Sequence, residues 1–352
     1  EGAVRRFPEE SPDGEAEDVL SRGFVADDEE GMEKKEKAAR QDINRYYLLK
    51  GKFSDRVHHA TASSGRHAGR EVVMWEWKLE DLETRGLADM RRMLVLDHRR
   101  LLNWFFRPKH HVAEMLEMIV TPQSCFYVME FLGGWNLKEL LNTGEQLSHK
   151  QIARILHDIL KAVDAVHRVR LFHRNIKTEK FQFDALGNVK LTDISVTMLH
   201  LAEAEERANI VGTPAYMSPE ALLGCARQPA DMWSVGVILH LMLTETFPFK
   251  GRTREEVRGA QSQPVDLSTG SWKEQPPLAR DMVEKILEFN AFKRITVEQA
   301  LSHQWIQTIE TEFVANFDSV ASGCSAPSAP SAAPCPGPPR GGGGTTSATA
   351  TS

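Results

Sequence analysis

Two short segments in the first half of the chain carry the residue types of β-strands. The segments EVVMWEWKL, from Glu71 to Leu79, and CFYVMEF, from Cys125 to Phe131, are rich in β-branched and aromatic residues. Such residues are enriched in strands because their side chains pack well on a pleated, half-buried surface. The pattern therefore predicts strands in the N-terminal part of the chain.

The hydrophobic spacing becomes helical further along the chain. In LSHKQIARILHDILKAVDAVHRV, apolar residues recur at helical intervals beginning with Ile152. Ser148 and Gln151 match the capping-box pattern, which predicts where this helix starts. The segment DMWSVGVILHLMLT is apolar around its whole circumference, as expected of a helix that is buried on every side. A small strand-rich half before a larger helical half indicates a two-lobed α+β fold.

Both ends of the chain lack this hydrophobic patterning. Residues 1–42 are rich in charged residues and poor in aromatics, so they cannot bury enough apolar surface to offset the entropy lost on ordering. From Ser319 onward the sequence is of low complexity, dominated by Ser, Ala, Pro and Gly. We therefore expect disorder over 1–42, one folded domain over 43–309 (small lobe 43–131, large lobe 132–309) and a flexible tail over 310–352.

Composition narrows the class of protein. The 352-residue chain has a formal net charge of -6, whereas a nucleic-acid binder normally carries a basic surplus. Its four cysteines show no CxxC or metal-ligand spacing, which favours reduced thiols in the cytoplasm, with the nucleus as the alternative. No apolar run approaches the ~18 residues of a membrane span, and we find no calcium loop of the EF-hand type. Because the sequence begins without Met, a targeting segment upstream of it could be missing.

Five motifs follow one another in the second part of the chain. They are HRNIK from His173, then VKLTDIS, GTPAYMSPE, DMWSVGVI and FNAFKRITVEQALSHQWI. In this order and spacing they resemble the C-terminal lobe of eukaryotic protein kinases, most closely the calcium/calmodulin-dependent serine/threonine group. The resemblance implies a two-lobed protein kinase fold with a small, antiparallel β-rich N-lobe and a larger helical C-lobe.

Residues that maintain the fold in this family are retained. By the resemblance, Glu220 and Arg294 form the ion pair that locks the end of the activation segment to the large lobe, and Asp231 holds the backbone of the catalytic loop. Removing one partner of a buried ion pair strands the other charge. The retention of Glu220, Asp231 and Arg294 therefore indicates that the large lobe still has to fold.

The nucleotide cleft that the resemblance implies departs from the family pattern. In LLKGKFSDRV only Gly51 remains of the three usual glycines, so a close approach of the backbone to phosphates is compromised. Val72-Val73-Met74-Trp75 stands where the family has Val-Ala-Ile-Lys, so Trp75 replaces the phosphate-pairing lysine and Val73 lines the adenine site. Lys78 as a shifted equivalent would point to the face opposite Trp75, because side chains alternate along a strand.

The end of the second predicted strand corresponds to the gatekeeper and hinge of the family. Met129 and Glu130 stand where these positions begin, and Leu132 follows them in the cleft. An ordinary buried strand without a ligand-facing role is the alternative interpretation of these residues.

The resemblance also implies that the catalytic loop has lost two of its reactive groups. Asn175 replaces the aspartate that accepts the substrate proton, and an amide has no basic lone pair for that task. Lys180 replaces the asparagine that binds the second magnesium ion, and an ammonium repels a metal. Asp193 either retains a metal-binding role or only hydrogen-bonds the loop backbone. Lys177 either meets the transferred phosphate or pairs with Glu179 or Thr213.

These changes predict a protein kinase-like domain that is a pseudokinase, acting as a scaffold or allosteric regulator in phosphorylation signalling. The alternative is a degenerate but active ATP-dependent serine/threonine kinase in which Lys52, Lys78 or Lys180 supplies the missing cation and Glu179 the base. On the first interpretation no cofactor is required, ATP binds weakly at most and magnesium is not needed. We expect the partner to be a protein or peptide in the C-lobe groove shaped by GTPAYMSPE, and neither nucleic acid nor a membrane.

Overall fold

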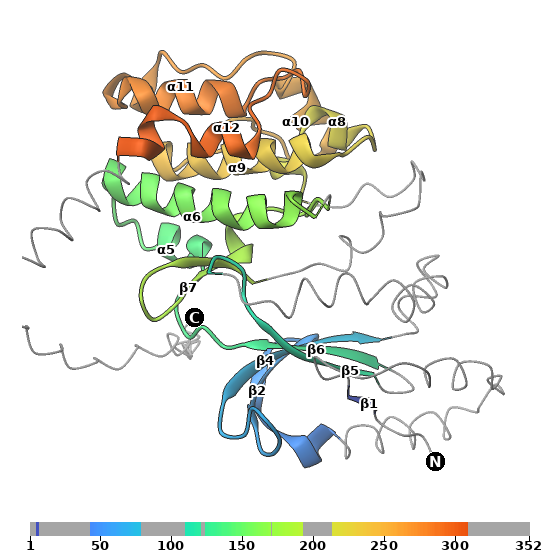
Figure 1. Cartoon of the computed structure of the whole chain (residues 1–352). Helices are drawn as coiled ribbons and strands as arrows, with labels where there is room; N and C mark the ends of the chain where they lie inside the picture. The colour runs from blue at the N-terminus through green and yellow to red at the C-terminus, as the bar shows by residue number, and fades with distance from the viewer. Residues whose placement is uncertain are drawn as a thin grey trace, which may run out of the picture. The chain divides into compact units, whose positions relative to one another are not determined.

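An antiparallel sheet of six strands forms the N-terminal lobe (Figure 1). The computed structural model describes residues 5–6, 43–78, 110–120, 124–169, 171–192 and 213–308. The strands lie in the order β1-β5-β6-β4-β3-β2. Their bounds are Arg5–Arg6 (β1), Tyr47–Ser54 (β2), Val57–Ala62 (β3), Glu71–Lys78 (β4), Met115–Val120 (β5) and Ser124–Glu130 (β6). The two strands predicted from the sequence are present as β4 and β6.

The register of the sheet decides which side chains share a face. Val57 and His59 of β3 pair with Trp75 and Val73 of β4, respectively. Residues that pair directly across an antiparallel ladder project to the same face, so these four side chains lie together. The opposite face carries Met74, which is completely buried in the core of the sheet.

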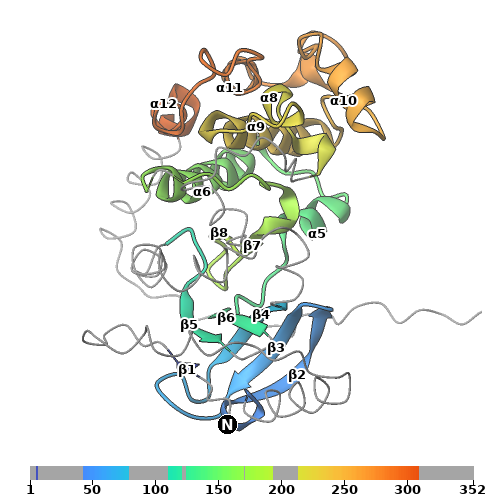
Figure 2. The ribbon, with the colours of Figure 1, turned by 90° about the vertical axis from the view of Figure 1, so that its right-hand side faces the viewer.

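The C-terminal lobe is helical (Figure 2). Its main helices are α5 (Leu137–Asn142), α6 (His149–His167), α8 (Pro219–Leu222), α9 (Gln228–Thr244), α10 (Arg254–Ala260), α11 (Pro277–Ile286) and α12 (Val297–Leu301). Three short 3-10 helices lie at Thr178–Lys180 (η1), Pro214–Tyr216 (η2) and Gly270–Glu274 (η3), and a two-stranded sheet pairs β7 (Phe181–Phe183) with β8 (Val189–Leu191). Helix α6 packs against α9 and α12, and α9 also packs against α11 (Figure 1).

Local sequence signals explain the two central helices. The Ser148 hydroxyl accepts a hydrogen bond from the Gln151 amide at the start of α6, so the predicted capping box is confirmed. Helix α9 is buried from Ala230 to Leu243, as its apolar circumference predicts. A Cβ added at Gly236 would come within 2.6 Å of Ile286, so α9 and α11 approach too closely for any larger residue there.

Backbone and side-chain contacts join the segment before β5 and the end of β6 to β8. The Leu191 amide donates to the His111 carbonyl at 2.9 Å, and the Ala113 amide donates to the Leu191 carbonyl at 2.9 Å. The Lys190 ammonium lies 2.8 Å from Glu130 Oε1, and both side chains are largely buried. These contacts hold the small sheet β7–β8 of the C-terminal lobe against the end of the N-terminal sheet.

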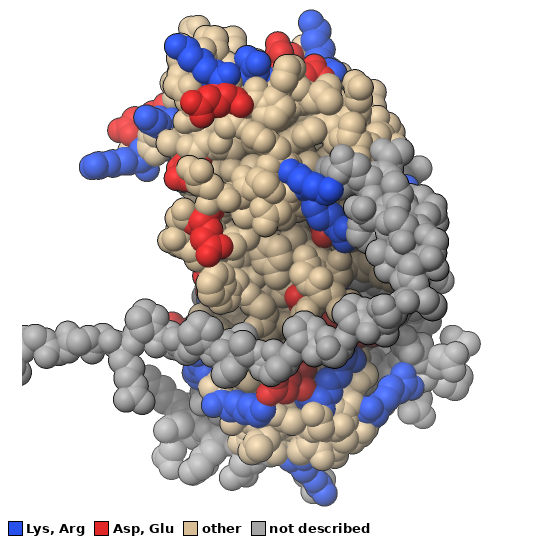
Figure 3. Space-filling view, turned by 90° about the vertical axis from the view of Figure 1, so that its left-hand side faces the viewer, with Lys and Arg blue, Asp and Glu red and all other residues tan. Residues whose placement is uncertain are grey.

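The fold is that of an α+β protein with a β-rich N-lobe and a helical C-lobe, so the predicted fold class is confirmed. On the face shown in Figure 3, basic and acidic side chains are intermingled. Within the described ranges, none of the helices has the length and apolar character needed to cross a membrane. The domain boundaries at 42/43 and 309/310 stay predictions, because residues 7–42 and 309–352 lie outside the described ranges.

Candidate functional site

A buried aspartate at the start of α9 organises the loop that carries Asn175 and Lys177. Asp231 accepts hydrogen bonds from the backbone amides of His173 at 2.7 Å and Arg174 at 2.8 Å. Arg174 has a φ of 64°, in the left-handed region that side chains other than glycine rarely adopt. The carboxylate of Asp231 therefore stabilises a strained turn, and this turn sets the direction in which the loop continues.

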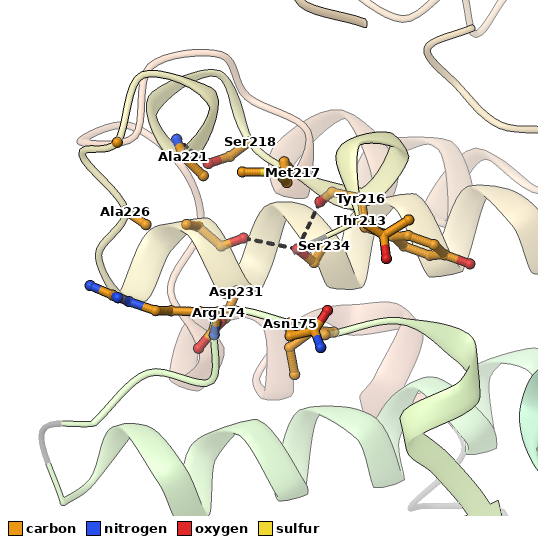
Figure 4. Close-up of a pocket in the computed structure, with 13 residues that line it drawn as sticks. Arg174, Asn175, Thr213, Tyr216, Met217, Ser218, Ala221, Ala226, Asp231 and Ser234 are labelled. Atoms are coloured by element: carbon orange, nitrogen blue, oxygen red, sulfur yellow. Dashed lines mark hydrogen bonds between the residues drawn. The ribbon is translucent and has the colours of Figure 1, made fainter. Parts of the chain in front are cut away.

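A small pocket separates this loop from the segment 213–218. Its volume is about 30 Å³, room for about one water molecule, and Arg174, Asn175 and Thr213 contribute to its lining (Figure 4). On its far side the Ser234 hydroxyl donates to the carbonyl oxygen of Tyr216 at 2.8 Å (Figure 4). Burial lowers the pKa of the Arg174 guanidinium to about 10, and the charge of Asp231 opposes this effect only in part.

Lys177 and Glu179 belong to one cluster of charges. The Lys177 ammonium lies 3.9 Å from Glu179 Oε1, and Lys138 donates to the same oxygen at 3.0 Å. The Thr178 hydroxyl contacts the second oxygen of Glu179 at 3.2 Å. Partial burial acts to raise the pKa of Glu179, but the hydrogen bond from Lys138 and the charge of Lys177 outweigh it, so the pKa is lowered. Glu179 is consequently a weaker base than an isolated glutamate.

Trp75 of β4 and Lys180 of η1 lie close to each other. The Lys180 ammonium lies 5.8 Å from the centroid of the Trp75 ring, within the range of a cation–π interaction. Both side chains are half-buried. The two residues that the family resemblance implies at the lysine and magnesium-ligand positions therefore lie within cation–π distance of each other.

An aromatic stack that no local sequence pattern predicts lies on the same face of the sheet as Trp75. The ring of His59 stacks on Phe131 with centroids 4.4 Å apart and on Phe53 with centroids 5.6 Å apart. Phe53 belongs to β2, His59 is paired with Val73, and Phe131 follows β6. Alternation along β3 could have placed His59 beside Val73, but the contact with Phe131 required the tertiary structure.

The other residues that the sequence assigns to the nucleotide cleft differ in burial and in contacts. Met129 is buried on β6 opposite Val73, and Leu132 is half-buried just beyond this strand. The side chain of Glu130 is committed to contacts within the protein, because it accepts hydrogen bonds from Lys190 and from the Glu114 amide at 2.8 Å each. Gly51 is exposed on β2, and a Cβ added there would have no neighbour within 4 Å.

Two of the three lysines that could replace the missing cation, Lys52 and Lys78, lie on the face of the sheet opposite Trp75. Lys52 pairs with His58, which pairs with Met74 on the face opposite Trp75. Lys78 is exposed at the end of β4, three residues beyond Trp75. Because side chains alternate along a strand, it also projects away from the Trp75 face. Of the three candidate lysines, only Lys180 reaches the cleft.

The structure also brings Glu220 and Arg294 together. Arg294 Nη1 lies 2.5 Å from Glu220 Oε1, and the Arg294 side chain is fully buried. Arg294 also donates to the carbonyl oxygens of Pro229 at 2.7 Å and Glu288 at 3.0 Å. This arginine therefore ties α8 to the start of α9 and to the segment after α11.

Asp193 lies outside the described residues, so its metal role stays a prediction. In the described ranges, His, Cys, Asp and Glu side chains form no group of three that could hold a metal ion. The charged groups of residues 177–180 are Lys177, Glu179 and Lys180, of which two are cations that oppose a metal ion.

Comparison with known proteins agrees with this architecture. A family profile described as protein kinase domain matches residues 99–306. The chain is 30% identical to Serine/threonine-protein kinase PEPKR2 of Arabidopsis thaliana over 199 residues, which is 56% of this chain and 42% of that protein. It is 27% identical to Calcium-dependent protein kinase 19 of the same plant over 281 residues, 76% of this chain and 48% of that protein.

A third relative is the CaM kinase-like vesicle-associated protein of Xenopus laevis. It is 25% identical over 278 residues, which is 71% of this chain and 72% of that protein. The chain spans less than half the length of the two plant relatives. The family profile covers more than half of the chain and includes the catalytic loop, the Glu220–Arg294 pair and α9. The chain therefore belongs to the protein kinase family.

Proposed function

We propose that this protein kinase domain is a pseudokinase, which acts as a scaffold or allosteric regulator by binding other proteins rather than by transferring phosphate. The observation that carries the proposal is the contact between Trp75 and Lys180. An indole stands where a cation would pair with ATP phosphates, and an ammonium stands where a magnesium ligand would lie. The residues in the cleft therefore do not fit a magnesium–nucleotide complex.

The aromatic stack supports the same proposal. His59 is paired with Val73, the residue assigned to the adenine site, and it stacks on Phe131 beside the predicted hinge. Stacked aromatic pairs are worth about 0.5–1.5 kcal/mol beyond their burial. A nucleotide would compete with contacts that the protein already makes to itself. The His59 and Phe131 rings therefore contact each other in the region where family members bind nucleotide.

A degenerate but active kinase is the second candidate, and Lys177 is the observation that favours it. This lysine is retained in the catalytic loop and is only partly exposed. The candidate requires a base, however, and the nearby carboxylate of Glu179 is held by Lys138 and has a lowered pKa. The geometry therefore supports the pseudokinase more strongly than the active enzyme.

Nucleotide binding tests the state of the cleft. We expect ATP to leave the thermal unfolding midpoint of the wild-type protein unchanged, with or without magnesium, because Trp75 occupies the phosphate-pairing position. Trp75→Lys should restore a cation and improve ATP affinity. A ligand present at 100 times its Kd stabilises a protein by about 2.7 kcal/mol, so restored binding would be visible as a raised midpoint.

Trp75→Leu is the matched control, since it removes the indole without adding a charge. An equal gain in both variants would identify obstruction by the ring as the barrier, whereas a gain in Trp75→Lys alone would identify the missing cation. If weak binding remains in the wild type, it should be independent of magnesium, because Lys180 already places a positive charge in the cleft. Micromolar ATP affinity that requires magnesium would contradict the proposal.

We propose that partners bind the groove shaped by residues 213–220. Ala215 is half-buried in η2. The segment is held to the rest of the lobe by the ion pair of Glu220 with Arg294 and by the hydrogen bond from the Ser234 hydroxyl to the Tyr216 carbonyl. Ala215→Arg should abolish the capture of partners by a tagged chain, while the unfolding midpoint changes little. Leu186→Arg, in an exposed turn of the same lobe, is the control and should retain them. Partners that survive Ala215→Arg but are lost on deleting 1–42 or 310–352 would assign the interaction to the flanking segments.

A further inference from the structure

A groove of about 840 Å³ lies on the C-terminal lobe, outside the cleft and outside the segment 213–220. One wall is a face of α11, on which Pro277, Arg280, Asp281 and Glu284 follow at helical spacing. The other wall is the segment 261–268 that follows α10. A volume of this size is typical of sites that bind ligands or peptide side chains.

The groove is acidic. Its lining holds the carboxylates of Asp266, Asp281, Glu284 and Glu288 against the single guanidinium of Arg280, a formal charge of -3. Asp281 is partly neutralised by Lys285 at 2.7 Å and contacts His303 Nε2 at 2.6 Å, whereas Glu284 is exposed on the groove face. Hydrogen bonds from Ser268 and Thr269 lower the pKa of Asp266 to about 2, so it stays ionised at neutral pH.

The floor of the groove is aromatic and contains unpaired polar atoms. Trp233 of α9 stacks on Phe249 with ring centroids 5.1 Å apart, and both rings are buried. Within the described residues, the Trp233 indole N–H and the Gln261 side-chain carbonyl have no hydrogen-bond partner, although both residues are at least 98% buried. Unpaired buried polar atoms cost free energy.

The rim adds an exposed aromatic surface. Phe289 lines the groove with 59% of its surface exposed, and Phe292, three residues on, is completely exposed. An aromatic ring at the edge of an acidic groove can contact both the aliphatic stem of a lysine or arginine and an apolar side chain. The groove thus combines negative charge with apolar contact area.

We propose that this groove binds a peptide segment of a partner protein in which lysine or arginine alternates with aromatic or large aliphatic residues. Basic side chains would pair with Glu284 and Glu288, and the apolar ones would pack on Phe289. The flanking segments of this chain lack the basic charge that an occupant of the acidic groove needs. Arg340 is the only basic residue in 310–352, and acidic residues outnumber basic ones in 1–42.

A direct binding measurement tests the groove. The probe is a short, fluorescein-labelled synthetic peptide in which Lys and Arg alternate with Leu and Phe, titrated with the full chain and followed by fluorescence anisotropy. A matched peptide with Glu at every basic position is the first control. We expect the basic probe alone to bind, Glu284→Lys to weaken its affinity about tenfold and Phe289→Ala to weaken it severalfold. Added salt should weaken binding as well, because the attraction is partly electrostatic.

Glu255→Lys is the matched charge control, since Glu255 is also exposed on a helix of the same lobe but does not line the groove. It should leave the affinity unchanged. Ala215→Arg should also bind the probe normally, so a failure of the 213–220 proposal is distinguishable from a failure of this one. Unfolding midpoints of all variants should match the wild type. Equal weakening by Glu284→Lys and Glu255→Lys, or no binding of the basic probe to the wild type, would overturn the proposal.

Discussion

Purified protein is expected to incorporate no phosphate from ATP into serine or threonine peptides, or into itself, above the background of the assay. Loss of a general base alone typically removes a factor of about 10²–10⁴ from the rate, and Asn175 cannot serve as that base. The cation that pairs with phosphates and the second magnesium ligand are replaced as well, by Trp75 and Lys180, which contact each other. Incorporation of labelled phosphate, with and without magnesium, measures the outcome.

An active protein kinase assayed in parallel is the positive control. Two variants of this chain then identify the source of any phosphate incorporation. Magnesium-dependent incorporation by the wild type that disappears in Asp193→Ala would contradict the pseudokinase proposal and show that the remaining aspartate still binds a metal. If such activity instead disappeared in Glu179→Gln, Glu179 would be the replacement base in spite of its hydrogen bond to Lys138. The wild type is expected to be indistinguishable from both variants.

The elements that could be predicted from the sequence are those specified by local patterns. The start of α6 follows from Ser148 and Gln151, which satisfy the first amides of the helix within a single turn. The burial of α9 follows from its continuous apolar surface, which has no polar face to present to water. The motifs of the C-terminal lobe carried the family resemblance, and the family profile matches the same part of the chain.

The features that could not be predicted depend on pairs of residues far apart in the sequence. The charge at Lys180 and the indole at Trp75 were visible separately, but their contact exists only because β4 and η1 meet across the cleft. His59 shows no sign of its role in the sequence, because only the register of β3 and the position of the chain after β6 bring its ring onto Phe131. The acidic groove combines α9, the segment after α10, and α11, and no local pattern joins these three.

Glu220→Ala is expected to destabilise the protein strongly. It removes the carboxylate that faces Arg294, whose side chain is fully buried, and so leaves a buried guanidinium without its counter-ion. Breaking a buried pair in this way costs about 3–5 kcal/mol. In a domain of this size about 1 kcal/mol corresponds to 2–4 °C, so the unfolding midpoint should fall by at least about 6 °C. Glu255→Ala, at an exposed position in α10, is the control and should change it by less than about 2 °C.

Arg294→Met should be at least as destabilising as Glu220→Ala, because the two side chains have unequal numbers of partners. In Glu220→Ala the guanidinium keeps its hydrogen bonds to the carbonyls of Pro229 and Glu288. In Arg294→Met both carbonyls and the carboxylate lose their donor, and the cation over the Trp233 ring at 5.0 Å is lost as well. The double variant should lose less than the sum of the single losses, because neither charge is then stranded. Strictly additive midpoint shifts would show that the pair is not coupled and that the lobe is held together by other contacts.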